Sequence, residues 1–508
     1  MGAPPRPRVV VVGGGITGLT AAYRLATARD AAVSPVVTLL EASPRVGGKL
    51  LTAEVAGAIV ETGPDSFVLR KPAAAQLCKE IGLEEDLLVP GASGAYVWAR
   101  GRLVEFPAGS AFGIPSTVES LARWPGLSPR GRSSAALDLW RGVPRSAREE
   151  DDESVAALVT RRLGREAADV LVLPVLAGIH AADPERMSVA ATFPELRTWE
   201  RGHGSLVRGA RAARRSASRS AKAPPPMFAT LDGGLERLSR ALAGEVGPDA
   251  IVASSPAERI ERTEGGAAYA VVAGGRRHPA DAVVVATPAA AAATALDALA
   301  PEAAAAAREL RTTSTATVTL VYPPGTADRL PVATGFLVPG RPGGSGDARG
   351  ALRAITACTW LSRKWPDESF EDRAVVRCFV GRDGEQDALT LDDEDLTGAV
   401  AADVELASPV GSVPAASLVT RWPDGMPQYD VGHLSCVARI EEALSAAAPG
   451  VVVAGAPYLG VGIADCVRQG DDAAEAVLRH LAETAEGTAG RGEPGVTDGR
   501  TEEAAWTT

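Results

Sequence analysis

The chain has 508 residues, more than one ordinary hydrophobic core can organise, so two or three domains are expected. Hydrophobic residues make up 46% of it, charged residues 23% and aromatic residues 4%, a composition typical of a globular protein. The net charge of -11 argues against a surface that follows nucleic-acid phosphates, because such a surface needs an excess of Lys and Arg. We therefore expect no nucleic-acid partner.

The patterns of cysteine, histidine and hydropathy indicate the compartment of the protein and whether it binds metal or crosses a membrane. The five cysteines form no CxxC pair, which favours a reducing compartment, and the five histidines show no metal-binding spacing, so no metal is predicted. No segment reaches the roughly 18 to 20 apolar residues of a spanning helix, and Met1–Arg8 lacks the apolar core of a secretory signal. We expect a cytoplasmic protein without a transmembrane segment, with peripheral membrane contact at most.

The beginning of the chain predicts a βαβ unit. Its elements are a strand at Val9–Val12, a glycine-rich turn at Gly13–Gly18, a helix at Leu19–Ala28 and a strand at Val36–Glu41. The turn reads GxGxxG, whose glycines permit a tight turn, close approach of a pyrophosphate and close packing of helix on strand. Glu41 ends the second strand, where a carboxylate accepts hydrogen bonds from a ribose. These features together predict a dinucleotide-binding site.

The residues after Glu41 bear on which dinucleotide binds. The run Arg45–Lys49 resembles the R-x-GG extension of the flavin-dependent amine oxidase superfamily, in which the Arg and the second Gly lie along the FAD phosphates. The run Glu61–Ser66 looks like that family's segment beside the flavin ring, where Gly and Pro keep bulk away. The resemblance implies FAD rather than NAD. No Cys or His stands in a recognised flavin-attachment motif, so the FAD is expected to be non-covalent.

The middle of the chain predicts helices and then a return to the first sheet. Helices are expected from about Ser154 to Ala210, with Gly164 as a stop signal. The Arg-, Ser- and Ala-rich segment 211–226 is predicted to be a mobile loop, because it offers little apolar surface to bury. A Gly233-Gly234 turn and a helix follow, and then apolar strands at Ile251–Ala253 and Asp281–Ala286 that belong with the first sheet.

A second sheet and a closing unit complete the pattern. Separated β-rich runs predict a second, partly antiparallel sheet, at Ala316–Val321, Phe336–Val338, Ala354–Leu361, Ala374–Val380 and Ser417–Thr420. The chain then returns with a strand at Val451–Ala454, a glycine-rich turn and a helix to about Leu481. A helix that starts near Ile463 would direct its positive end at the flavin and stabilise the reduced ring. The tail 486–508 is expected to be disordered.

Three stretches narrow the resemblance to the protoporphyrinogen/coproporphyrinogen oxidase family: Leu173–Leu196, Met227–Leu235 and Met426–His433. With the flavin motifs, the resemblance covers nearly all of residues 8–482. It implies oxygen-dependent oxidation of a reduced tetrapyrrole in haem biosynthesis. Such a substrate loses hydride from carbons next to electron-rich pyrroles, so placement does most of the catalysis, and no acid or base is assigned.

The resemblance also implies roles for two substrate-binding residues. Gly178 corresponds to the glycine whose backbone packs against the macrocycle, and Arg100 to the arginine that pairs with a propionate. His180 and His433 receive no catalytic role, and Trp422 is either a flavin-edge residue or a core tryptophan. The expected cofactor-binding residues are Gly13, Gly14, Gly15, Ile16, Thr17, Gly18, Glu41, Ala42, Arg45, Gly48, Lys49, Gly63, Pro64, Asp65, Ser66, Ala257, Trp422, Val461, Gly462 and Ile463.

Two substrates and two other classes of function stay open. Soluble Gram-positive members act on coproporphyrinogen III, and the Ala-, Arg- and Gly-rich composition looks actinobacterial, so this substrate is preferred over protoporphyrinogen IX by analogy alone. Another flavoenzyme of the superfamily and a non-catalytic porphyrin-binding protein are the other hypotheses. The next haem-pathway enzyme is a candidate partner.

The fold class expected is α/β with three domains. A discontinuous Rossmann-like FAD-binding domain takes residues 8–90, 227–300 and 431–485, and an inserted mixed-sheet substrate domain takes residues 91–105 and 301–430. A helical domain takes residues 106–210.

Overall fold

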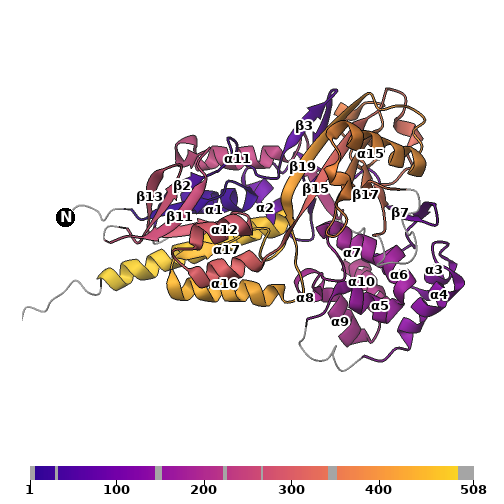
Figure 1. Cartoon of the computed structure of the whole chain (residues 1–508), viewed down its shortest axis with the longest axis horizontal. Helices are drawn as coiled ribbons and strands as arrows, with labels where there is room; N and C mark the ends of the chain where they lie inside the picture. Colours follow the sequence, from indigo (N-terminus) through magenta and orange to yellow (C-terminus); the bar gives the residue numbers. More distant parts are fainter. Residues whose placement is uncertain are drawn as a thin grey trace, which may run out of the picture.

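The computed structural model describes residues 6–28, 33–143, 152–220, 226–264, 267–340 and 352–489. It is a mixed α/β structure in which three regions are distinct (Figure 1). One contains the first sheet with helices α1, α12, α16 and α17, the second contains β15, β17 and β19, and the third is helical. Segments far apart in sequence meet in the first two regions.

The first sheet is parallel, with five strands in the order β10-β2-β1-β14-β20. Its strands are almost wholly apolar because helices cover both faces. Val9 and Val11 of β1 pack toward α1 and α17, while Val10 and Val12 pack toward α12, α13 and α16. The elements are β1 Arg8–Val12, α1 Ile16–Thr27, β2 Val36–Leu40, β10 Ile251–Val252, β14 Ala282–Val285, α12 Ala289–Leu296, α13 Pro301–Glu309, α16 His433–Ala447, β20 Val451–Val453 and α17 Ile463–Ala489.

The second large sheet has seven strands in the order β19-β15-β18-β17-β16-β7-β8. Its pairs are antiparallel except β16 with β7, in agreement with the partly antiparallel sheet expected from the sequence. Helix α15 packs on one face of it around Val400 and Val404. The elements are β7 Tyr96–Ala99, β8 Arg102–Glu105, β15 Thr312–Val321, β16 Gly335–Leu337, β17 Ile355–Trp360, α14 Leu361–Lys364, β18 Val375–Val380, α15 Asp393–Ala407 and β19 Ala416–Pro427.

The helical region is organised around buried charges. Arg162 and Asp138 are almost fully buried, and the Arg162 guanidinium donates to the Asp138 carboxylate at 2.6 Å. Helix α5 ends where the sequence predicted, because Gly164 follows it with a φ of 83°. The helices are α3 Val118–Arg123, α4 Pro129–Ala136, α5 Val155–Leu163, α6 Arg165–Ala167, α7 Leu173–His180, α8 Val189–Thr192, α9 Pro194–His203 and α10 Leu206–Ser220, with 3-10 and π turns at Leu137–Leu139 and Ala168–Val172.

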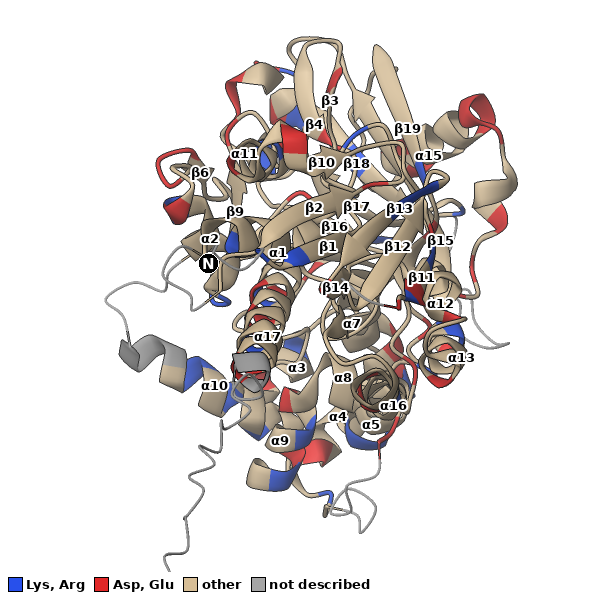
Figure 2. Cartoon of the chain, turned by 90° about the vertical axis from the view of Figure 1, so that its left-hand side faces the viewer, with Lys and Arg blue, Asp and Glu red and all other residues tan. Residues whose placement is uncertain are grey.

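The prediction of a mobile loop at 211–226 is wrong for its first ten residues. Helix α10 runs through Leu206–Ser220, with basic residues along its exposed side (Figure 2). Leu206, Val207 and Ala210 are buried, so the helix docks through apolar residues that lie just before the predicted loop. Residues 221–225 lie outside the described part. Helix α17 likewise continues to Ala489, four residues into the predicted tail 486–508, whose residues 490–508 also lie outside.

The remaining elements are short strands and helices outside these groups. None of the described helices is long and apolar enough to cross a membrane. The remaining elements are β3 Thr52–Val55, β4 Ala58–Glu61, β5 Phe67–Val68, α2 Ala73–Glu80, β6 Leu87–Leu88, β9 Phe228–Leu231, α11 Glu236–Val246, β11 Ala257–Arg262, β12 Tyr269–Ala273 and β13 Arg276–Ala280, with 3-10 turns at Pro248–Ala250, Ala327–Arg329, Glu368–Phe370 and Asp387–Thr390.

Candidate flavin and substrate site

The glycine-rich turn between β1 and α1 has the shape that its three glycines predict. Gly13 has a φ of +106°, and a Cβ there would lie 2.5 Å from the Ala286 carbonyl oxygen. A Cβ on Gly18 would lie 1.9 Å from the Gly13 carbonyl oxygen, so no side chain fits between helix and turn. A Cβ on Gly15 would meet no atom within 4 Å. The N-terminal end of α1 therefore has open space at Gly15, next to its unpaired backbone donors.

Glu41 connects this turn to the second strand. Its Oε2 accepts a hydrogen bond from the Gly14 amide at 2.7 Å, and its Oε1 accepts from the Ser43 amide at 2.8 Å. The Ser255 amide donates to the Glu41 carbonyl oxygen at 2.8 Å, which brings Ala257, at the start of β11, close to this strand end. The exposed Ala42 lies directly after Glu41. These residues form one edge of the site.

The loop of Arg45, Gly48 and Lys49 crosses over the glycine-rich turn. The Gly47 amide donates to the Gly14 carbonyl oxygen at 2.7 Å, and a Cβ on Gly48 would lie 3.2 Å from the Gly15 Cα. The Arg45 guanidinium donates to the Gly48 carbonyl oxygen at 2.6 Å and so holds the loop in shape. Lys49 is accessible, yet desolvation by the surrounding protein lowers its pKa, with Cys466 acting in the opposite direction.

The segment Gly63–Ser66 lies between Lys49 and the second large sheet. A Cβ on Gly63 would lie 2.0 Å from the Lys49 carbonyl oxygen, so only glycine fits there. The Trp422 indole donates to the Thr62 carbonyl oxygen at 3.1 Å, which places this predicted residue beside the segment. Asp65 accepts from Lys364 at 2.9 Å and from Ser66 at 2.9 Å. Burial alone would raise the pKa of Asp65, but Lys364 and Arg377 outweigh it and hold the pKa well below its usual range.

The C-terminal turn and helix complete the arrangement. The Gly460 amide donates to the Tyr429 hydroxyl at 2.7 Å, and Val461 and Gly462 lead into α17 at Ile463. A Cβ on Gly470 would lie 2.6 Å from the Thr17 carbonyl oxygen, so α17 packs closely on α1. The two ends of the chain thus present two helix N-termini, at Ile16 and Ile463, within one region.

Gly178 and Arg100 lie on neighbouring elements outside the first sheet. Gly178 is exposed within α7, and a Cβ there would meet only Leu337 of β16, at 3.7 Å. Leu337 pairs with Val97 of β7, and Arg100 follows in the turn after that strand, with a φ of 55°. The Arg100 guanidinium is 53% exposed and lies 3.8 Å from the Glu166 carboxylate, a spacing that leaves the charge accessible.

Both histidines of interest contact buried protein groups. His433 Nε2 lies 2.7 Å from the Tyr458 carbonyl oxygen, and its ring stacks on Tyr429 at 3.9 Å. Desolvation, reinforced by Lys71, lowers the pKa of His180 to about 4, so this histidine is neutral at neutral pH. The Gln428 amide donates to the His180 carbonyl oxygen at 3.1 Å and anchors the end of α7.

Sequence reasoning missed three side chains that hold the Glu61–Asp65 segment: Thr317, Lys364 and Arg377. A signal was present for one of them. Arg377 is the single charged residue in the apolar run Ala374–Val380, and such a charge is rarely buried without partners. The run was interpreted only as a strand.

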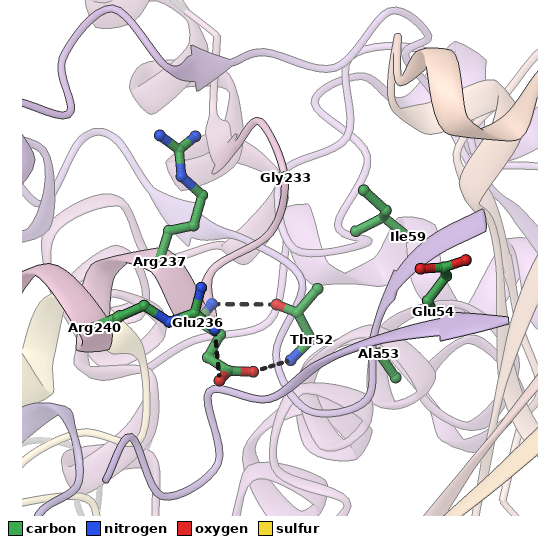
Figure 3. A pocket seen from close by; sticks show the side chains of 8 residues that line it. All are labelled: Thr52, Ala53, Glu54, Ile59, Gly233, Glu236, Arg237 and Arg240. Carbon is green, nitrogen blue, oxygen red and sulfur yellow. Dashed lines mark hydrogen bonds and ion pairs between the residues drawn. The ribbon is translucent and has the colours of Figure 1, made fainter. Parts of the chain in front are cut away.

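An open pocket of about 220 Å³ lies beside this region, between the β3–β4 hairpin and the start of α11 (Figure 3). Glu236 and Thr52 exchange two hydrogen bonds of 3.2 Å at its base. Its lining includes none of the residues predicted to bind the cofactor or substrate. Among the described residues, no group of three or more His, Cys, Asp or Glu could hold a metal ion.

Comparison with protein families and sequences gives consistent matches. The model of the family described as flavin containing amine oxidoreductase matches residues 16–478. The coproporphyrinogen III oxidase of Bacillus subtilis is 35% identical over 481 residues, which is 94% of this chain and 99% of that protein. The coproporphyrinogen III oxidase of Staphylococcus aureus is 30% identical, over 93% of this chain and 99% of that protein.

Solved structures show the same fold. A crystal structure from Exiguobacterium sp. 255-15, provisionally named protoporphyrinogen oxidase, matches with a TM-score of 0.80 and 32% identity over 94% of this chain and all of that one. Cyclohexylamine oxidase from Brevibacterium oxydans matches with a TM-score of 0.66 at 19% identity, over 94% of this chain and all of that one, a likeness of fold alone.

Proposed function

The chain belongs to the family of flavin-containing amine oxidoreductases, and from that premise we propose that it oxidises coproporphyrinogen III to coproporphyrin III with a non-covalent FAD. The observation that carries the proposal is that relatives at 30 to 35% identity, matched over almost their whole length, are named for this reaction. The substrate loses six hydrogen atoms in this oxidation, and these carry six electrons in all.

The residues around the glycine-rich turn fit FAD. The open space at Gly15 adjoins the N-terminus of the twelve-residue helix α1, which is suited to a pyrophosphate. Glu41 is placed to accept ribose hydroxyls, although in this structure its oxygens accept from Gly14 and Ser43. Gly63 and Pro64 would line the ring, with Trp422 at its edge, and the N-terminus of α17 would face it from Ile463. A bound flavin supplies the hydride acceptor that no side chain can provide.

The chain's own contribution to the reaction is placement. The exposed backbone at Gly178 allows the macrocycle to lie against α7, because no side chain projects there. Arg100 supplies a positive charge for a propionate. It follows strand β7, whose Val97 pairs with Leu337 of β16, and Leu337 in turn lies beside Gly178. Orientation of this kind lowers the barrier without an acid or base at the reacting carbon.

The choice of coproporphyrinogen III over protoporphyrinogen IX rests on similarity. The relatives from Bacillus subtilis and Staphylococcus aureus are named for the first substrate. A protoporphyrinogen oxidase of Arabidopsis thaliana chloroplasts is 28% identical over 90% of this chain, so the second substrate remains the alternative. The two differ by two carboxylates, which a cationic pocket would distinguish.

The proposal also covers the electron acceptor, the location, a partner protein and the domain division. Molecular oxygen is the electron acceptor, and the next haem-pathway enzyme is a partner that receives the product. The location is cytoplasmic. The five cysteines are all free, in keeping with a reducing compartment. We propose the division into FAD-binding, substrate and helical domains at the boundaries expected from sequence, with the part of α10 beyond residue 210 added to the helical domain.

The test is a peroxide assay with each porphyrinogen. The purified protein is expected to carry a yellow flavin that acid precipitation releases, and to form hydrogen peroxide faster with coproporphyrinogen III at equal concentration. Faster turnover of protoporphyrinogen IX would transfer the assignment to the alternative. A flavin-free protein that binds porphyrin without peroxide formation would exclude the oxidase function.

A further inference from the structure

Three consecutive backbone carbonyls of the Glu61–Asp65 segment are held by the second large sheet. The Arg377 guanidinium donates to the carbonyl oxygens of Glu61 and Gly63 at 2.9 and 2.8 Å. Between them, the Thr62 carbonyl oxygen accepts from the Thr317 hydroxyl at 2.8 Å and from the Trp422 indole at 3.1 Å. These donors come from the adjacent strands β18, β15 and β19, so one sheet face fixes the segment.

Strand β18 and the short helix α14 supply the cations of an ion cluster at the end of the segment. Asp65 lies 2.9 Å from the Lys364 ammonium and 3.3 Å from the Arg377 guanidinium, and Arg377 is only 1% exposed. Lys364 is 12% exposed and lies over the ring of Trp365 at 4.8 Å. Two cations face the Asp65 carboxylate, and the buried Glu61 carboxyl at the start of the segment also interacts with Arg377. Buried charge at such a site acts with little screening from solvent.

The carbonyl oxygens of Glu61, Thr62 and Gly63 point toward the second large sheet. The opposite side of the segment therefore faces the loop that contains Lys49 and crosses over the glycine-rich turn. Gly63 is pressed against the Lys49 carbonyl oxygen on that side, where a Cβ would lie at 2.0 Å. The segment cannot move toward Lys49, and the donors of the sheet prevent it from moving away. Its position is therefore determined by residues of a different sheet from the one that carries the dinucleotide motif.

We propose that Arg377 and Lys364 are positioning residues that fix the Glu61–Asp65 segment against the bound flavin and that the positive charge of Lys364 favours its reduced form. This inference rests on the proposed flavin site. It assigns a part in tuning the cofactor to Arg377 of strand β18 and to Lys364 of helix α14. Neither residue needs to touch the substrate for this effect.

The test compares three variants with a matched control in the holoenzyme. Arg377→Lys keeps the charge but cannot bridge two carbonyls and a carboxylate, Thr317→Val removes one hydrogen bond without a charge, and Lys364→Met removes one charge. Arg363→Met is the control, because its side chain bonds the Leu330 carbonyl oxygen and the exposed Asp328 instead. Flavin dissociation constant, flavin absorbance and midpoint potential are measured, with the melting temperature of each apoprotein.

We expect Arg377→Lys to weaken flavin binding at least tenfold and change the flavin absorbance, with Thr317→Val acting less in the same direction. Lys364→Met should lower the preference for reduced flavin about tenfold, which is a fall of about 30 mV in the potential of this two-electron couple. Arg363→Met should change neither quantity.

Unchanged binding, absorbance and potential in the folded variants would overturn the inference. If Arg377→Lys lowers the melting temperature of the apoprotein but leaves the flavin properties normal, Arg377 has a structural role only, and the inference is likewise overturned. If Arg377→Lys fails to fold, Thr317→Val and Lys364→Met decide the matter, because they touch the same segment. A wild-type protein that binds no flavin would instead refute the proposed function.

Discussion

The carbonyl oxygen of Gly13 lies 1.9 Å from the position that a Cβ on Gly18 would occupy, whereas a Cβ on Gly15 would meet no atom within 4 Å. The two glycines of one motif therefore serve different ends. Gly18 is needed for the packing of α1 on the turn. Gly15 leaves space that the protein itself does not fill.

Gly15→Val is expected to abolish flavin binding while the apoprotein melts near the wild-type temperature. The holoprotein difference should be large, because a ligand at about 100 times its dissociation constant stabilises the native state by roughly 2.7 kcal/mol. Gly18→Ala is the contrasting variant and should destabilise the apoprotein itself. Normal flavin content in Gly15→Val would remove Gly15 from the site. Calorimetry of apo and reconstituted proteins measures both effects.

Gly178→Ala is expected to stabilise the protein slightly while slowing turnover. The added Cβ has room beside Leu337 at 3.7 Å, and Ala is favoured over Gly within a helix by roughly 0.5 to 1 kcal/mol. Against a macrocycle the same methyl group would obstruct approach, so kcat/KM should fall at least about tenfold, near 1.4 kcal/mol. Gly244→Ala in the exposed face of α11 is the control and should stabilise without loss of activity. Equal activities would place the substrate elsewhere.

Arg100→Ala is expected to raise KM for coproporphyrinogen III and leave flavin content unchanged. If the arginine meets a propionate, the loss in kcat/KM is roughly 1.5 to 3 kcal/mol, and if it stays a solvated charge beside Glu166 the loss is well under about 1 kcal/mol. Arg102→Ala, two residues away, is the matched control. The tetramethyl ester should bind wild type and variant about equally. Equal losses for acid and ester would show that Arg100 shapes the pocket wall rather than pairing with charge.

Glu61→Gln is expected to become more stable relative to wild type as the pH rises. Burial raises the pKa of Glu61 to about 6, against the opposing bonds from Leu235 and Thr52. A raised folded-state pKa stabilises the fold below the unfolded value of 4.5, and this contribution is lost as the pH rises through 6. The shift corresponds to about 2 kcal/mol.

The measurement for Glu61 is the difference in melting temperature between variant and wild type from pH 4.5 to 7.5. Differences are needed because the lowered pKa of His180 acts in the opposite sense, removing stability as the pH falls. That effect is common to both proteins and cancels. Glu54→Gln on the neighbouring strand changes an exposed carboxylate and serves as the control. A constant difference for Glu61→Gln would mean that the pKa of Glu61 is the same in the folded and unfolded states.

Five strands of each large sheet could be predicted because their apolar runs are separated by glycine and polar turns, whereas β7 and β8 of the second sheet were not among the predicted strands. Val9–Val12 and Ala316–Val321 both lie within strands that the structure contains. The segment 211–220 was assigned from its overall composition, which hid the helical spacing of Leu206, Val207 and Ala210 against the core. Periodicity across the segment boundary would have indicated the helix.

The geometry of the candidate site was predictable where spacing along the chain determines it, as in the turn Gly13–Gly18 with Glu41, and the cofactor-binding role of these residues stays a prediction. It was not predictable where the partners are remote, because no local pattern connects Arg377 with Gly63, or Thr317 with Thr62. Those pairs are made by the register of a seven-stranded sheet and by the packing of that sheet on the Glu61–Asp65 segment. The role of Arg100 stays a prediction, since its guanidinium lies nearest Glu166.

The close packing of α17 on α1 has a consequence for biosynthesis. The first sheet receives its last strand, β20, only after Val453, and the helix N-terminus at Ile463 follows it. A nascent chain on the ribosome has exposed its glycine-rich turn long before these elements emerge. The cofactor therefore meets a complete pocket only after β20 and the start of α17 have emerged from the ribosome, and until then the early half of the first sheet must be kept from aggregating by other means.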